Sequence, residues 1–125
     1  MSTDYNALVV ASRTEHRVFS FDDARALLPM VKEITAEAVH QAGRIATRLQ
    51  RLAETDPERA PLNEALRDVI RRWTTRLHAL GVEVKGLWLV DFDNGEGYYC
   101  WSYPEESLTH YHGYDDGFGG RMKIV

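Results

Sequence analysis

The sequence predicts an α+β fold, in which a long antiparallel helical hairpin over residues 20–80 packs on a small antiparallel β-meander over residues 82–125. In the first part, apolar residues recur at alternating spacings of four and three, which is typical of helices that pack along one stripe. After Gly81 the apolar spacing changes to two, which favours strands. Asn94-Gly95 is a strong hairpin signal within that second part.

Residues 18–125 are expected to form one domain, because a chain of 125 residues fits a single core. Residues 1–17 are predicted to be a tail or an added edge strand, with a short strand at 7–11. The apolar run in that segment is too short for a signal peptide, and no run approaches the ~20 residues of a membrane helix. A single cysteine excludes an intrachain disulfide, so we expect a cytoplasmic protein.

Ser20 is a favoured N-cap for the first helix, and Asp23 suits the positive charge at a helix start. An interior proline removes one backbone hydrogen bond and kinks or breaks a helix. Pro29 therefore predicts a short N-terminal helix over 21–28 and then a long helix over 29–54, although one kinked helix is equally consistent with the sequence.

Two apolar stripes define the hairpin. The first stripe comprises Val31, Thr35, Ala38, Ala42, Ile45, Leu49 and Leu52, and the second comprises Leu62, Leu66, Val69, Trp73, Leu77 and Leu80. Pro57 interrupts the helical pattern between the two stripes, and the short turn there implies antiparallel helices. Two helices cannot bury both stripes alone, so the remaining apolar surface must meet the sheet or a second copy. We expect a homodimer through the helices.

The meander is predicted from segments in which apolar residues recur at every second position. A lead-in strand at 82–84 is followed by strands at 87–92, 98–103, 108–112 and 122–125. With Asn94-Gly95 at the turn, Asp91 is expected opposite Tyr98, and Leu89 opposite Cys100. Side chains alternate between faces. One face is then expected to carry Asp91, Tyr98 and Cys100, and the other, packed on the helices, to carry Trp88, Val90, Tyr99 and Trp101.

Several short motifs keep a fixed order along the chain. They are Phe19-Ser20-Phe21-Asp22-Asp23-Ala24 with Leu27-Leu28-Pro29, then Leu89-Val90-Asp91-Phe92, Tyr99-Cys100-Trp101, Tyr111-His112 and Gly117-Phe118-Gly119-Gly120-Arg121. From about Val18 to the C-terminus, this series resembles the prokaryotic family known as domain of unknown function 2203. The chain departs from the pattern at Tyr99 and Tyr111, where the family prefers Leu and Trp. The resemblance implies a fold and shared positions, but no activity.

The net charge of -4 argues against general nucleic-acid binding, and neither a nucleic acid nor a membrane is an expected partner. The charge is uneven, because the helical part is rich in arginine. Between Val82 and Asp116 the chain carries one lysine, Lys85, and eight acids, namely Glu83, Asp91, Asp93, Glu96, Glu105, Glu106, Asp115 and Asp116. This distribution indicates either a solvated surface or an acidic pocket for a cation or an amine.

His110 and His112 lie two residues apart on a predicted strand, so both side chains point the same way. Such a pair can chelate a divalent metal ion, with Asp115, Asp116, Asp91 or Cys100 completing the site. We take His110, His112 and Asp116 as the candidate metal ligands. The alternative is that His110 lies at the surface and His112 makes a hydrogen bond inside the fold.

Arg121 follows a glycine-rich loop in a part of the chain that has few cations. It is expected to form a structural clamp with Asp91, Asp115 or Asp116. Alternatively, its guanidinium binds a carboxylate or phosphate ligand through two hydrogen bonds.

The leading functional hypothesis is a polar pocket between the meander and the helices. The residues expected to line it are Asp91, His112 and Arg121, with Glu105 or Glu106. They are expected to bind a small polar ligand or a metal ion, and in the second case the protein could be a metal-dependent enzyme. The second hypothesis is a non-catalytic homodimeric interaction module, in which the same cluster locks the meander to the helices.

Overall fold

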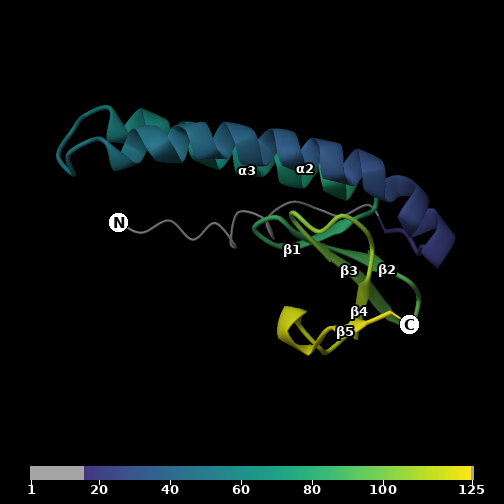
Figure 1. The fold of residues 1–125 in the computed structure, drawn as a ribbon. Helices are drawn as coiled ribbons and strands as arrows, with labels where there is room; N and C mark the ends of the chain where they lie inside the picture. The colour runs from purple at the N-terminus through teal and green to yellow at the C-terminus, as the bar shows by residue number, and fades with distance from the viewer. Residues whose placement is uncertain (1–15, 125) are drawn as a thin grey trace.

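A computed structural model of the chain describes residues 16–124 and confirms the α+β fold. Figure 1 shows a helical hairpin lying across one face of an antiparallel sheet. Most of segment 1–17, including the strand predicted at 7–11, lies outside the described residues. The elements are α2 (Phe21–Gln50), α3 (Arg59–Ala79), β1 (Glu83–Gly86), β2 (Leu89–Asp93), β3 (Gly97–Ser102), β4 (His110–Gly113), the 3-10 helix η1 (Phe118–Gly120) and β5 (Met122–Lys123).

Helix α2 continues through Pro29, so the short helix predicted over 21–28 is not a separate element. Ser20 caps it as expected, because its hydroxyl accepts a hydrogen bond from the Asp23 N–H at 3.0 Å. Figure 1 shows the first turns of α2 bent relative to the rest. A bend is the expected response to an interior proline, whose ring displaces the carbonyl four residues earlier. Packing therefore outweighs the cost of the missing hydrogen bond.

The two helices are joined at a buried polar contact. The indole N–H of Trp73 in α3 donates to the hydroxyl of Thr35 in α2 at 2.9 Å. The Trp73 ring also packs edge-on against Trp88, with ring centroids 4.8 Å apart. These contacts tie α2, α3 and the entry to β2 into one core. Neither of the described helices is both long and apolar enough to cross a lipid bilayer.

The sheet has the order β1-β2-β3-β4-β5, as a meander requires. The predicted pairing of β2 with β3 is wrong by two residues, since Asp91 faces Cys100 and not Tyr98. The reason is the turn: Asn94 N–H bonds to the Gly97 carbonyl, so Gly95 and Glu96 occupy its centre. Gly95 has a φ of 90°, which suits glycine at the first central position of a primed turn.

A shift of two residues leaves every side chain on its predicted face. The face toward the helices is apolar and carries the buried Val84, Val90, Phe92 and Trp101. The opposite face is polar and carries Glu83, Lys85, Asp91, Cys100 and His112. Trp88, predicted within the strand, instead lies just before β2 with a φ of 62°.

Gly97 in β3 leaves no room for a side chain beside β4. A Cβ at this position would lie 2.6 Å from the backbone carbonyl oxygen of His112. We expect Gly97→Ala to lower the free energy of unfolding by roughly 1–3 kcal/mol, the usual cost of overpacking. Urea denaturation measures this. Gly119→Ala is the matched control, because no atom beyond its own chain neighbours lies within 4 Å of its Cβ position. An equal loss in both variants would show that the close contact at Gly97 is not the cause.

Candidate metal centre

Three adjacent strands each contribute one buried side chain of a type that can bind a metal ion to the polar face of the sheet. Asp91 comes from β2, Cys100 from β3 and His112 from β4. One ligand atom from each of the three lies within 4.8 Å of the others. Register explains the convergence, since Asp91 pairs with Cys100 and His112 pairs with Tyr98, the residue two positions before Cys100. The exposed fractions of Asp91, Cys100 and His112 are only 2%, 1% and 4%.

Both ring nitrogens of His112 face hydrogen-bond acceptors. Nδ1 lies 2.8 Å from the carbonyl oxygen of Gly113, which can only accept, so Nδ1 carries a hydrogen. Nε2 lies 2.9 Å from Oδ2 of Asp91. A second proton must therefore lie between Nε2 and Oδ2, held either by the imidazole or by the carboxyl group. This is the proton that a metal ion would replace.

The other oxygen of the Asp91 carboxyl group, Oδ1, is buried and has no hydrogen-bond partner among the described residues. A buried oxygen without a partner is costly, on the order of 1–3 kcal/mol. Burial raises the pKa of Asp91, and the neighbouring His112, together with the Cys100 thiol, which also interacts with this carboxyl group, offsets the rise only in part. Asp91 is thus a carboxyl group with one free ligand atom in a poorly solvated position.

The Cys100 thiol is protonated at neutral pH in this environment. Burial, followed by the negative charge of Asp91, raises its pKa to about 12, although the Arg121 guanidinium acts in the opposite direction. The thiol is therefore inert as a nucleophile in the metal-free protein. A bound metal ion would displace its proton, because the metal ligand is the thiolate.

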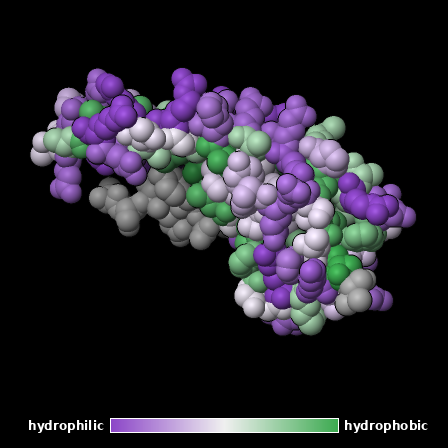
Figure 2. Space-filling view, viewed as in Figure 1, coloured by the Kyte–Doolittle hydropathy of each residue, from purple (hydrophilic) through white to green (hydrophobic). Residues whose placement is uncertain are grey.

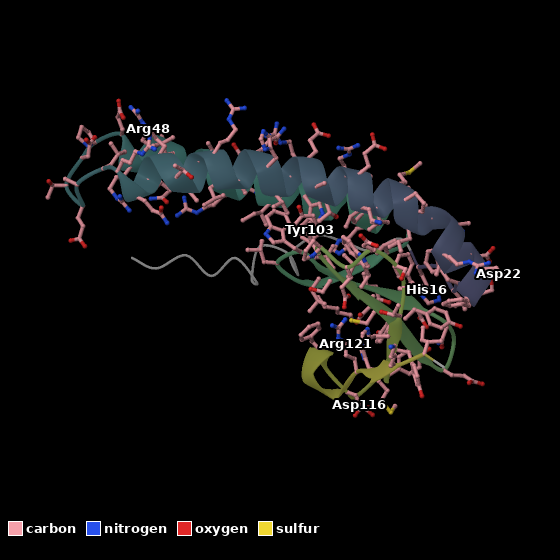
Figure 3. The ribbon with its side chains drawn as sticks, viewed as in Figure 1. His16, Asp22, Arg48, Tyr103, Asp116 and Arg121 are labelled. Atoms are coloured by element: carbon pink, nitrogen blue, oxygen red, sulfur yellow. The ribbon has the colours of Figure 1, made fainter. Side chains whose placement is uncertain are left out.

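The three side chains open into a pocket of about 410 Å³. Its walls come from β1 to β4 and from the segment after β4, and include Lys85, Tyr98, Tyr114, Asp116 and Phe118. No residue of α2 or α3 lines it. The pocket predicted between meander and helices is therefore misplaced: it lies on the other face, where the C-terminal segment covers the sheet (Figures 1 and 3). The helices support it only from behind.

Arg121 and Glu105, both predicted to bind a ligand, instead bind each other. The guanidinium makes two hydrogen bonds to the carboxylate, at 2.9 and 2.8 Å. The carboxylate also accepts from the Ser102 N–H at 2.8 Å. Arg121 thus forms the predicted clamp, but with Glu105 and not with Asp91, Asp115 or Asp116.

The candidate metal ligands His110, His112 and Asp116 do not converge on one point. His110 Nδ1 lies 2.9 Å from the Thr109 hydroxyl and 3.7 Å from Glu105. Asp116 is exposed at the pocket rim, where it accepts from the Gly113 N–H at 3.3 Å. Only His112 belongs to the cluster, and Asp91 and Cys100 take the other two places. The hydrogen bond predicted for His112 in the metal-free alternative is also present.

The Glu105–Arg121 pair predicts an acid-sensitive part of the stability. Burial opposes ionisation of Glu105, but the hydrogen bonds from Arg121 and the Ser102 N–H outweigh it and lower the pKa of Glu105. A lowered pKa in the folded state gives stability that is present above the unfolded value of about 4.3. That stability is lost as the pH falls through the folded value. We expect the free energy of unfolding to decline less below about pH 4.5 in Glu105→Gln than in wild type.

Urea denaturation at several pH values measures this difference. Glu106→Gln is the matched control, since the Glu106 side chain is exposed and the residue contacts Lys32 through its backbone carbonyl. If the free energy of unfolding declines equally at low pH in wild type and in Glu105→Gln, the pair does not stabilise the fold.

The cluster has the composition of a three-ligand metal centre. One carboxylate oxygen, one thiolate and one imidazole nitrogen suit a borderline metal ion such as Zn²⁺. Tetrahedral coordination at bonds of ~2.0–2.3 Å requires ligand atoms about 3.3–3.7 Å apart, so side-chain shifts on the order of 1 Å suffice. The Nδ1 hydrogen bond to Gly113 is the outer contact that typically orients a metal-bound histidine.

Comparison with known proteins places the chain in a family without assigning it a reaction. No curated protein and no solved structure matches it. One family model matches residues 17–124, which contain every element described above. The chain therefore belongs to the family described as uncharacterized conserved protein (DUF2203).

Proposed function

We propose that this protein binds a divalent transition-metal ion, best Zn²⁺, through Asp91, Cys100 and His112. One observation carries the proposal. A fully buried carboxyl group has an oxygen without a partner next to a thiol and to an imidazole whose far nitrogen is held by a backbone carbonyl. A purely structural cluster would be expected to satisfy that oxygen.

Three protein ligands leave a fourth position for a metal ion, which is typical of catalytic and not of structural zinc sites. The pocket in front of the cluster gives that position room for a water or a small polar ligand. A zinc ion there would lower the pKa of a bound water to about 7 and polarise a ligand oxygen. The carboxylates of Asp115 and Asp116 also line the pocket, and their negative charge favours entry of a cation.

Metal titration of the purified protein tests this proposal. We expect one equivalent of Zn²⁺ to bind and Co²⁺ to give a thiolate-to-metal charge-transfer band. Cys100 is the only cysteine, so Cys100→Ser must abolish that band. The proposal fails if wild type binds no more Zn²⁺ than Cys100→Ser, or if the cobalt spectrum lacks the band.

The alternative, a structural cluster in an interaction module, is favoured for one part of the predicted site. Glu105 and Arg121 make two hydrogen bonds to each other, and we infer that they lock the β3–β4 connection to the C-terminal segment. Asp91 and His112 do not share this role. The homodimer through the helices involves a partner chain and stays a prediction.

A further inference from the structure

A groove between α2 and α3 is separate from the metal centre. It consists of two depressions, of about 530 and 160 Å³, which share Gln41, Val69 and Arg72. Its floor is apolar and includes Ile34, Ala38, Ile45, Leu62, Val69 and Trp73. Ile45 and Leu62 remain half-exposed there, because the stripe of the hairpin extends beyond the residues that the partner helix covers.

The rim of this groove carries more positive than negative charge. Four arginines line it, namely Arg44, Arg48, Arg72 and Arg76, against two acids, Glu37 and Asp68, of which Asp68 pairs with Arg71. Arg44, Arg72 and Arg76 are exposed, and within residues 16–124 none of the three has an ion-pair partner. Other arginines of the hairpin behave differently: Arg48 pairs with Glu58 at 2.9 Å. Figure 2 shows hydrophilic residues over the outer side of the hairpin, and Figure 3 places Arg48 near its far end. The groove thus combines an apolar floor with free arginines.

We propose that this groove binds an amphipathic helix of another protein, one that carries acidic residues beside an apolar stripe. An apolar stripe would fill the floor, and the acidic flanks would pair with Arg44, Arg72 and Arg76. The lining residues of α2 run from Ile34 to Arg48, which corresponds to ~21 Å or about four helical turns. A helix of about 14 residues matches that length.

Charge also distinguishes the possible occupants. A two-fold dimer presents the same patch on both copies, so it would bring two positively charged patches together. An acidic helix has no such repulsion. A nucleic acid would satisfy the arginines but would leave the apolar floor without a matching surface, which disfavours it.

A designed peptide provides the test. The probe is a labelled helix of about 14 residues with leucines at helical spacing and glutamates on both flanks. Two control peptides have the leucine order scrambled or the glutamates replaced by lysines. We expect fluorescence anisotropy to detect binding of the glutamate peptide alone, weakened by salt. Arg72→Glu combined with Arg76→Glu should weaken binding at least about 10-fold, while Arg25→Glu, outside the groove, should not.

Three results would overturn the proposal. The first is equal binding of the scrambled or the lysine peptide. The second is co-sedimentation with phosphatidylserine vesicles that depends on Arg72 and Arg76, without peptide binding, which would indicate a membrane surface. The third is a dimer in sedimentation equilibrium that the same double variant dissociates, which would indicate a second copy. Circular dichroism checks that each variant keeps its helices.

Discussion

Replacing His112 by asparagine is expected to weaken Zn²⁺ binding by at least about 100-fold, since even outer contacts of metal ligands are worth about 10–100-fold. Asparagine offers no imidazole nitrogen in place of Nε2, which lies 2.9 Å from the Asp91 carboxylate. The matched control is His110→Asn. His110 lies on the same strand and the same face, but outside the cluster, so its replacement should leave the affinity unchanged. Competition against a chelating dye measures both.

This result is separable from a loss of folding. His112→Asn also removes the partner of a buried carboxyl group, which can destabilise the protein. Asp91→Asn and its neighbour Asp93→Asn form a second matched pair on β2, in which only Asp91 belongs to the cluster. Asp93 instead accepts a hydrogen bond from the Tyr114 hydroxyl at 2.7 Å. If both variants of either pair bind Zn²⁺ as wild type does, Asp91, Cys100 and His112 are not the metal site.

The largest effect on stability is expected for Trp73→Ala, which should lower the free energy of unfolding by roughly 3–5 kcal/mol. Trp73 is 2% exposed, contacts the Trp88 ring and donates to Thr35. Its removal leaves a cavity where both helices meet the sheet. Small domains have a total stability of about 5–15 kcal/mol, so the variant should be close to unfolding at 37 °C. Urea denaturation followed by circular dichroism measures the loss.

Thr35→Val separates the hydrogen bond from the packing. Valine keeps the shape of threonine but leaves the Trp73 indole N–H without its partner, which should cost roughly 1–3 kcal/mol. The loss should be smaller than for Trp73→Ala. Equal losses in the two variants would mean that the hydrogen bond, and not the volume of the indole, stabilises the junction.

The architecture was predictable because its signals are local. The apolar stripes, the cap at Ser20 and the change of period after Gly81 each depend on neighbouring residues. The cap and the change of period agree with the structure, whereas α2 ends at Gln50 and not at residue 54, which leaves the predicted stripe residue Leu52 beyond the helix. The response of α2 to Pro29 was not predictable. Whether a helix bends or breaks there depends on how much distant packing stabilises the two halves, and that packing is a property of the whole fold.

The candidate site was predictable only in part. Strand alternation placed Asp91, Cys100 and His112 on one polar face, because alternation survives a register error of two residues. It could not show that Cys100 lies opposite Asp91, since this depends on which residues occupy the turn centre. Likewise, Arg121 pairs with Glu105 because the fold brings two separate segments together, and no local sequence pattern shows that these segments are close.

The three cluster residues belong to three consecutive strands, and this has a mechanical consequence. An ion held by all three would act as a cross-link across β2, β3 and β4, and would stabilise the folded state, in which alone the three ligands meet. Amide hydrogen exchange in these strands would then slow together when the ion is added, whereas the distal turns of the helical hairpin would keep their rates. The sheet would become the last part of the molecule to open.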